Sequence, residues 1–221
     1  MDMVSVSSTA RAAACALFLA MLVAGHQPAL AAGDPVSLVD PLVGTAGNPN
    51  DGPSDTFPGA DAPFGMLQWS PDTPSRPSGG GYAYNDADIT GFSLTHLSGP
   101  GCDVFGDVSI LPTMGEIIKP GSERQSFRHT TEVATPGYYE VMVGQPAIRS
   151  QLTVTARTGL GAFSFPPATQ ASILVNAASN QVGVADAAIR FAGPSEIDGW
   201  ATSGWFCGMP GTYTVFFCLA L

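Results

Sequence analysis

Glycine and proline interrupt this chain so often that long helices have little room to form. The 221 residues include 26 glycines and 19 prolines, spread along the chain without a fixed period. Both residues mark turns and end regular elements. The lack of a period excludes a collagen-like repeat, and 12 Phe, 5 Tyr and 3 Trp exclude a disordered chain. We therefore expect short strands joined by turns.

Alternation of apolar and polar residues is clearest after residue 137. In the run 148–157, Leu152, Val154 and Ala156 share one face, and polar residues share the other. This period of two is typical of a half-buried antiparallel strand. We also expect strands at residues 66–70, 89–97, 104–112, 138–143, 162–165, 171–176 and 212–218. Such strands, with turn residues between them, predict an all-β fold, a large antiparallel β-sandwich.

The first 32 residues have the pattern of an export signal. Arg11 precedes an apolar run of 12 residues, and small residues follow, with an A-x-A-like cleavage site at 29–31. This order is typical of a secretory signal peptide. An uncleaved anchor is the weaker alternative, because a span needs roughly 20 residues. We expect residues 1–32 to be removed and residues 33–221 to form one secreted or periplasmic domain, without a membrane span.

Charge restricts the class of partner. The chain has 8 Lys and Arg against 18 Asp and Glu, a formal net charge of −10. An acidic protein repels the phosphates of nucleic acids and the headgroups of anionic membranes. We therefore expect no nucleic-acid partner.

Three cysteines follow the predicted signal: Cys102, Cys207 and Cys218. An odd number permits one disulfide at most in this set, and an oxidising compartment allows it. Cys207 and Cys218 flank the turn-like segment 208–211, so they could pair across a hairpin. Equally, each could be a small buried hydrophobic residue. Cys102 is then left over, and no Cys/His spacing indicates zinc.

The segment 91–107 carries the most chemistry. A predicted strand delivers His96 and Ser98 into the turn 99–101, which Cys102 follows. Glycines let a backbone approach a ligand closely, and His and Ser offer adaptable hydrogen bonds. The spacing excludes a nucleophile elbow and a phosphate loop. From the residues alone, His96 is either a ligand contact or, as we favour, a hydrogen-bonded structural residue.

Four aspartates, Asp86, Asp88, Asp103 and Asp107, lie near this segment. Paired carboxylates could hydrolyse glycosides, and oxygen ligands could bind calcium. The sequence around Asp86 instead favours an Asx-type turn, and the EF-hand pattern is absent. We expect no metal site here.

Phe57 lies in the Gly- and Pro-rich loop 56–65. Aromatic rings stack on sugar faces, so this loop could line a sugar site. It could equally be a rigid hinge.

Many short motifs of this chain resemble, in order, the N-terminal domain of glycoside hydrolase family 92. That family comprises calcium-dependent, exo-acting α-mannosidases. The motifs lie at residues 39–45, 57–60, 63–66, 70–73, 81–84, 89–93, 95–99, 106–107, 111–112, 135–141, 152–157 and 163–166. Each is weak alone, but so many in one order make the set specific.

The resemblance implies a β-sandwich followed by a larger (α/α) barrel-like domain. It implies hydrolysis of terminal α-linked mannose with inversion, in which an acid protonates the leaving oxygen and a base activates water. The family's acid, base and most Ca²⁺ ligands lie in the C-terminal domain. We therefore expect no catalytic or metal-binding residue in this chain, no activity of the chain alone, and Ca²⁺ in the full-length enzyme. The apolar run 215–221 also favours a piece of a longer protein.

The resemblance further implies that loops of the N-terminal domain form part of the substrate pocket. The substrate contacts that it implies are Phe57, His96, Ser98, Gly99 and Cys102. The implied partners are mannose-terminated glycans and the missing C-terminal catalytic domain.

Two departures from the family leave the cleaved linkage open. Leu94 stands where many relatives have a second His. Residues 76–81 lack the aromatic residue and the Cys that many relatives have before the Gly-Tyr motif. An alternative from another class is a stand-alone, secreted carbohydrate-binding β-sandwich without catalysis.

Overall fold

The computed structural model describes residues 33–47, 55–167 and 170–221. The predicted signal peptide, residues 1–32, lies outside the described residues. The chain divides into two compact units, Met1–Leu38 and Val39–Leu221. The described part of the first holds one 3-10 turn, η1 (Pro35–Leu38). All described strands belong to the second unit.

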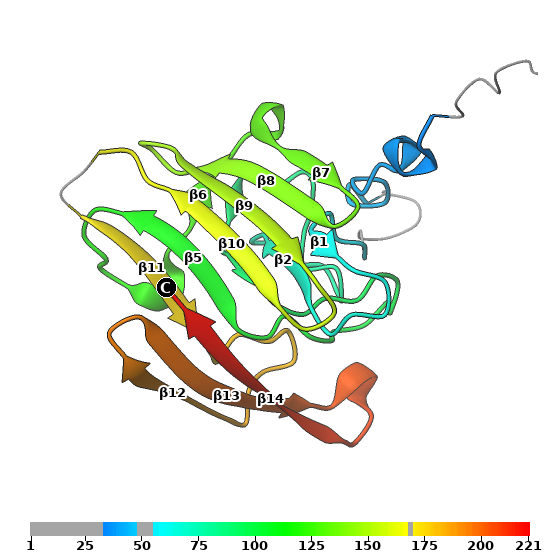
Figure 1. Cartoon of the computed structure of the whole chain (residues 1–221). Coiled ribbons are helices and arrows are strands. Elements are labelled where there is room, and N and C mark those ends of the chain that lie inside the picture. Colours follow the sequence, from blue (N-terminus) through cyan, green and yellow to red (C-terminus); the bar gives the residue numbers. More distant parts are fainter. Residues whose placement is uncertain (1–32, 48–54, 168–169) are drawn as a thin grey trace, which may run out of the picture. The chain divides into compact units, whose positions relative to one another are not determined.

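Two antiparallel sheets form the body of the second unit (Figure 1). The first has the order β1-β2-β4-β5-β11, and the second has the order β10-β9-β8-β7. The strands of the first are β1 (Ala60–Asp61), β2 (Gln68–Asp72), β4 (Gly91–Ser93), β5 (Ser109–Met114) and β11 (Ala171–Asn176). Those of the second are β7 (Val133–Thr135), β8 (Tyr138–Val143), β9 (Ile148–Val154) and β10 (Gly159–Ser164).

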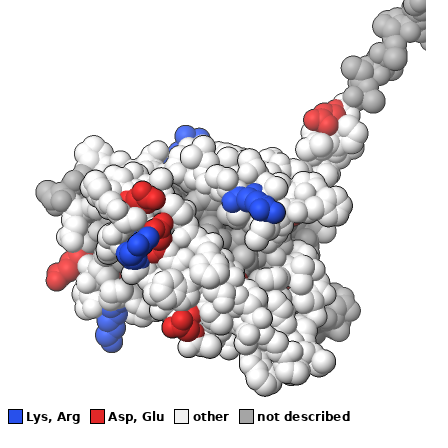
Figure 2. Space-filling model, turned by 60° about the horizontal axis from the view of Figure 1, so that its bottom comes forward, with Lys and Arg blue, Asp and Glu red and all other residues white. Residues whose placement is uncertain are grey.

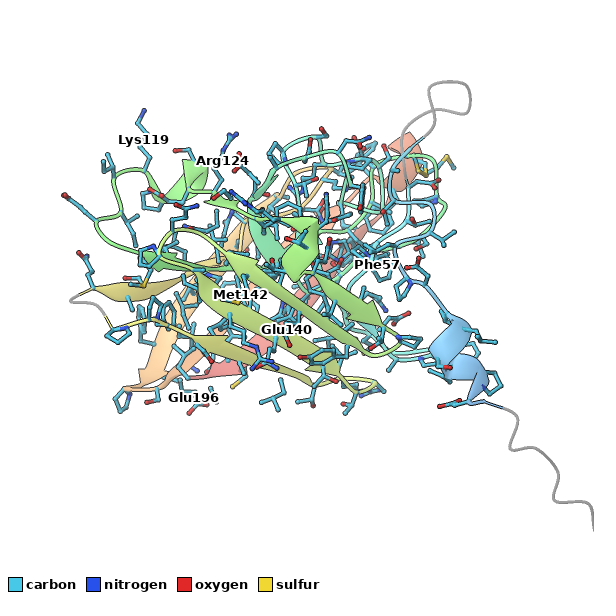
Figure 3. All side chains as sticks on the ribbon, turned by 90° about the horizontal axis from the view of Figure 1, so that it is seen from above. Phe57, Lys119, Arg124, Glu140, Met142 and Glu196 are labelled. Carbon is cyan, nitrogen blue, oxygen red and sulfur yellow. A yellow bond between two sulfur atoms is a disulfide. The ribbon has the colours of Figure 1, made fainter. Side chains whose placement is uncertain are left out.

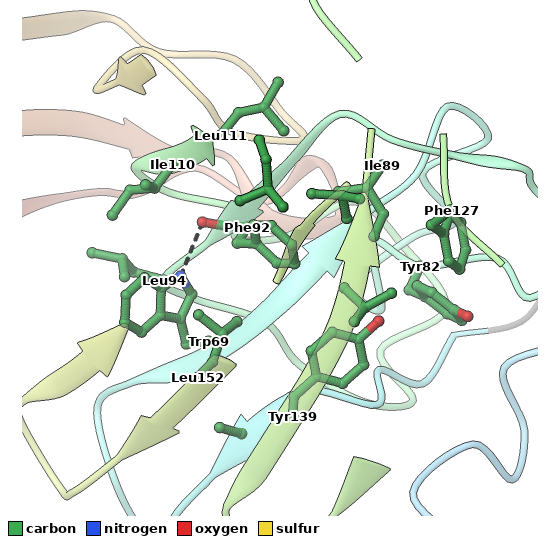
Figure 4. Close-up of a cluster of buried hydrophobic side chains, with 14 of the residues drawn as sticks. Trp69, Tyr82, Ile89, Phe92, Leu94, Ile110, Leu111, Phe127, Tyr139 and Leu152 are labelled. Carbon is green, nitrogen blue, oxygen red and sulfur yellow. Dashed lines mark hydrogen bonds between the residues drawn. The ribbon is translucent and has the colours of Figure 1, made fainter. Parts of the chain in front are cut away.

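Apolar side chains from both sheets form one core (Figure 4). Trp69 and Phe92 come from the first sheet, and Tyr139 and Leu152 come from the second. The Trp69 indole Nε1 donates a hydrogen bond to the Phe92 carbonyl at 3.1 Å, so its single polar group is satisfied inside the core. The predicted all-β sandwich is confirmed.

A third sheet contains β12 (Asp186–Gly193), β13 (Glu196–Gly204) and β14 (Thr212–Ala220), in that order. It is drawn in orange to red in Figure 1. Phe217 and Leu219 on β14 pack against the main core. The turn η4 (Phe206–Gly208) joins β13 to β14.

The remaining elements are short. Strands β3 (Asp88–Ile89) and β6 (Gln125–Ser126) pair with each other. Two 3-10 turns, η2 (Pro120–Ser122) and η3 (His129–Thr131), flank β6. The described part of the chain contains no α-helix, as the glycine and proline content predicts, and none of its helical turns has the length and hydropathy to cross a membrane.

The predicted strands differ from the observed ones mainly at their ends. The run 138–143 is β8 and the run 171–176 is β11. The run 89–97 is not one strand, because β3 ends at Ile89 and β4 ends at Ser93. Strands β12 and β13 were not predicted, since small residues and Gly199 break their apolar alternation.

The disulfide between Cys207 and Cys218, which the sequence analysis left as one alternative, does not form. Cys207 bonds to Cys102, with 5.2 Å between their Cα atoms, and Cys218 is free and exposed. The hairpin explains why. Cys218 lies well along β14, opposite Asp198, whereas Cys207 lies in the turn before that strand. An extended strand rises about 3.3 Å per residue, which carries Cys218 away from the turn.

Candidate functional site

His96 is the most deeply buried of the predicted site residues. Only 2% of it is exposed, and both ring nitrogens have partners. Its Nδ1 lies 2.8 Å from the Gln68 carbonyl oxygen. Since a carbonyl oxygen only accepts, Nδ1 carries a proton. The other nitrogen, Nε2, lies 3.2 Å from Ser93 Oγ and 3.3 Å from Asp72 Oδ1. This geometry gives His96 the hydrogen bonds of a structural residue.

Asp72 connects His96 to Arg76. Its Oδ1 lies 3.5 Å from Arg76 Nε as well as near the imidazole. Burial raises the pKa of this carboxyl, but the Arg76 charge and the hydrogen bond with His96 outweigh it, so the pKa is lowered overall. Asp72 was not among the predicted site residues, because its partner His96 lies 24 residues further along the chain.

Glycines allow two loops to meet around this pair. A Cβ on Gly81 would lie 2.6 Å from Asp72 Oδ1 and 3.0 Å from His96 Nε2, and the backbone there has φ +71°. A Cβ on Gly79 would overlap the Pro100 ring. The Leu97 amide donates to the Gly79 carbonyl at 3.1 Å. Only glycine permits this close approach.

The Gln181 side chain ties the same loops together. Its amide nitrogen donates to the Pro77 carbonyl at 3.0 Å, and its Oε1 accepts from the Gly79 amide at 2.7 Å. That oxygen also accepts from the Val104 amide at 3.3 Å. Gln181 lies more than 70 positions from each of these partners in the sequence. Local sequence patterns therefore cannot reveal that it holds these loops together.

Ser98 and Gly99 are exposed at the tip of the cluster. Gly99 has φ +81°, and its amide donates to the Asp55 carbonyl at 2.8 Å. Phe57 is half-buried, and its ring centroid lies 5.3 Å from that of His96. Backbone, hydroxyl and aromatic groups are thus available to a ligand with hydroxyls. We call residues 96–102 with Phe57 the Ser98 loop site.

The disulfide fixes one end of the Ser98 loop site. Cys102 is bonded to Cys207 in η4. Beside this bond, the Phe206 ring packs edge-on against Phe105 at 4.7 Å and lies 5.2 Å from Tyr213. Among the five predicted site residues, Phe57 contacts His96, whereas Ser98, Gly99 and Cys102 follow His96 in the same loop, and Cys102 has no free thiol.

Three of the four aspartates accept hydrogen bonds from neighbouring groups. Asp86 accepts hydrogen bonds from the Ser75 amide and hydroxyl across the loop, so it is not the local Asx turn we expected. Asp103 accepts from the Ser78 hydroxyl. Asp107 is fully buried and is bound by Thr95, Asn180 and Tyr213.

The described residues contain one group that could hold a metal ion: Glu196, Asp198 and Cys218. It does not fit calcium. Ca²⁺ takes six to eight oxygen ligands, whereas one of these three residues is a thiol and Asp198 is already paired with Arg190. This exposed group lies on β13 and β14, not in the Ser98 loop site.

The fold and this loop cluster define a β-sandwich domain that presents hydrogen-bonding loops without an evident acid–base pair among its described residues. A family model for the glycosyl hydrolase family 92 N-terminal domain matches residues 38–221. The chain belongs to this family.

The similar proteins are much longer than this chain. A family GH92 alpha-mannosidase from Bacteroides thetaiotaomicron is 32% identical with a TM-score of 0.72, and the match covers 83% of this chain and 25% of that one. The same enzyme in complex with mannoimidazole gives a TM-score of 0.73. An inverting family GH92 mannosidase from that organism is 26% identical with a TM-score of 0.62, covering 76% of this chain and 24% of that one.

A curated protein is also similar to part of this chain. An uncharacterized secreted glycosidase from Arthroderma benhamiae is 32% identical over 142 residues, which are 61% of this chain and 18% of that protein. The chain therefore spans about a quarter of the length of the solved relatives and less of the curated one.

Proposed function

We propose that this chain is the N-terminal, pocket-forming domain of a secreted α-mannosidase that removes terminal α-linked mannose with inversion. The observation that carries the proposal is the family match over residues 38–221, which includes the whole Ser98 loop site. The two Bacteroides relatives are mannosidases, and one was solved with mannoimidazole. The fungal relative is a secreted glycosidase, which supports secretion.

The roles within the Ser98 loop site follow from exposure. Ser98 and Gly99 are exposed and Phe57 is half-exposed, so these residues contact the sugar or its leaving group. His96 and Cys102 hold the loop in place, His96 through its hydrogen bonds and Cys102 through its disulfide. Substrate binding therefore depends on His96 because its ring nitrogens hold the loop in place, not because the ring contacts the sugar.

The chemistry of hydrolysis needs groups from a second domain. An inverting glycosidase separates its two carboxyl groups by about 6.5–9.5 Å around the scissile bond. Near the Ser98 loop site, Asp72 and Asp107 are buried, and Asp103 accepts a hydrogen bond from the Ser78 hydroxyl. We assign the general acid, the general base and the calcium ligands to a C-terminal catalytic domain, consistent with the poor fit of the Glu196 group to calcium. Calcium there would supply a positive charge beside the reacting sugar.

The test is saturation-transfer NMR with a mannose-terminated oligosaccharide and the purified chain. We expect transfer to the terminal mannose, and its loss in Ser98→Trp, which blocks the exposed loop. Ser195→Trp is the matched control, because Ser195 is exposed in the turn between β12 and β13.

Two outcomes contradict this function. Absence of transfer to the unmodified, folded chain would reject a pocket-forming role. Release of mannose from an aryl α-mannoside by the chain alone, with calcium, would reject the assignment of catalysis to another domain.

A further inference from the structure

Trp205 differs from the other two tryptophans in what its indole group contacts. Trp69 is buried, and its Nε1–H donates to the Phe92 carbonyl at 3.1 Å. Trp200 donates its Nε1–H to Asp186 Oδ2 at 2.9 Å. Trp205 is 57% exposed, and its indole nitrogen has no hydrogen-bond partner within the described part of the chain. Its side chain therefore offers both an apolar ring face and a free donor to a ligand.

The backbone holds Trp205 in a conformation that a bulky residue rarely adopts. Trp205 has φ +59° and ψ +33°, in the left-handed region, and Cys207 has φ +55°. This region is strained for residues with a large side chain. Such strain persists only where the surrounding structure enforces it, and it clusters at active sites and ligand-binding positions. A glycine at position 205 would remove the strain, but it would also remove the ring.

Several contacts hold the turn η4 in this conformation. The Trp205 amide donates to the Gly211 carbonyl at 2.8 Å, and the Gly208 amide donates to the Trp205 carbonyl at 2.9 Å. The Phe206 ring packs against two other aromatic rings, with centroids 4.7 and 5.2 Å away. Trp205 makes no such ring contact with the residues that the structure describes. Phe206 thus anchors the turn, and Trp205 is exposed at a fixed position.

The disulfide places Trp205 beside the Ser98 loop site. Cys207 is bonded to Cys102, with 5.2 Å between their Cα atoms. Trp205 comes two residues before Cys207, and two residues span at most about 7 Å. Figure 3 labels Phe57 of the Ser98 loop site well apart from Glu196, where β13 begins. Trp205 follows the other end of β13, so it lies at the edge of the loop site that Cys102 forms.

We propose that Trp205 is a further glycan-contact residue at this edge of the Ser98 loop site. Its ring stacks on the face of a sugar, and its Nε1–H donates to a sugar hydroxyl. A ring on a fixed turn is suited to this role, because little conformational freedom is lost on binding. The identity of the ligand, a mannose-terminated glycan, rests on the proposed function.

The experiment is a titration of the ¹⁵N-labelled chain with α-1,2-mannobiose, followed through the indole N–H signals by NMR. The three tryptophans give three such signals, which single Trp→Phe variants assign. We expect the Trp205 indole signal and the amides of Ser98 and Gly99 to shift together and to saturate. The Trp200 indole signal should stay in place, because Asp186 already accepts its hydrogen bond.

Variants of Trp205 separate stacking from hydrogen bonding. Trp205→Ala should weaken binding about tenfold, since it removes both the ring and the donor. Trp205→Phe keeps a ring and loses only the donor, so it should weaken binding about threefold. Trp200→Ala is the matched control, because it removes another partly exposed tryptophan, and it should bind as the parent chain does. Circular dichroism checks that each variant is folded.

Three outcomes overturn this role. Shifts of Ser98 and Gly99 without a shift of the Trp205 indole, with Trp205→Ala binding as the parent does, would reject Trp205 while the proposed function stands. No shift of any signal in a folded chain would reject both proposals. Equal weakening by Trp205→Ala and Trp200→Ala would indicate a general loss of structure, and it would reject a contact specific to Trp205.

Discussion

At the scale of single residues, Gly81 has no room for a side chain beside Asp72 and His96. Gly81→Ala would place a methyl group 2.6 Å from Asp72 Oδ1 at φ +71°. We expect a loss of about 3 kcal/mol in the free energy of unfolding, from backbone strain and overlap. Urea denaturation measures it. Gly121→Ala is the control, because nothing lies within 4 Å of a Cβ there. Equal stability of the two variants would contradict this account.

Asp72 makes stability depend on acid pH. Its pKa is lower in the folded chain than the ordinary value, because the Arg76 charge and the His96 hydrogen bond outweigh burial. A lowered folded pKa gives stability that is present above the unfolded pKa, about 3.9, and is lost as pH falls through the folded pKa.

Asp72→Asn should therefore flatten the fall in stability below about pH 4. Thermal melts of the variant and the parent chain at several pH values check this. Asp103→Asn removes an exposed carboxylate and serves as the control. A parent-like pH profile in Asp72→Asn would show that Asp72 does not contribute.

The candidate site was only partly predictable from its residues. Motif order and glycine content selected the loop around His96 and Ser98. The residues that hold this part of the chain could not be selected from sequence, because Asp72 is distant in sequence from its partner His96, and Gln181 is distant from its partner Gly79. A hydrogen bond between distant loops leaves no local periodic signal.

At the scale of elements, a strand could be predicted from the sequence where its buried and less buried residues alternate. Strand β8 alternates half-buried and buried residues along its whole length, so its period of two is visible in the sequence. Strand β12 is exposed or half-buried throughout and contains few large apolar residues. Its pairing with β13 supplies the order that its own sequence does not indicate.

The disulfide ties a loop to the turn of the last hairpin. Replacing Cys102 and Cys207 together by Ser should lower the free energy of unfolding by about 2–4 kcal/mol, since the bond closes a loop of 105 residues. Thermal unfolding measures the loss. Cys218→Ser is the control and should change little, because Cys218 is exposed.

Thiol titration of the denatured, unreduced chain checks the pairing directly. After removal of residues 1–32, one free thiol is expected, and Cys218→Ser should leave none. Three thiols in the unmodified chain would contradict the bond.

At the scale of the whole molecule, charge is sparse. Figure 2 shows separate charged side chains on a mostly uncharged face. Inside the molecule, one carboxylate accepts hydrogen bonds from several neutral side chains. The buried Asp107, just before β5, accepts from Thr95 Oγ1 at 2.7 Å, Asn180 Nδ2 at 2.9 Å and the Tyr213 hydroxyl of β14 at 2.8 Å. This carboxylate joins the first sheet to the third.

Asp107→Ala should remove the acceptor shared by these three donors, each of which loses one hydrogen bond, and cost about 3–5 kcal/mol. We expect hydrogen exchange to rise most in β12, β13 and β14, because their connection to the first sheet is lost. Asp103→Ala, an exposed neighbour, should cost less than 1 kcal/mol. Uniform exchange throughout the chain would contradict a local role for Asp107.

The disulfide between Cys102 and Cys207 also sets an order of events during synthesis. Cys102 cannot form its disulfide until Cys207, which lies 105 residues later, has been synthesised. At about 5–20 residues per second, ribosomes need roughly 5–20 s to make that stretch. During this interval the Cys102 thiol is unpaired, and Cys218 follows only 11 residues after Cys207. Folding must therefore select Cys207 over Cys218 as the partner of Cys102, although the two cysteines lie close together in the sequence.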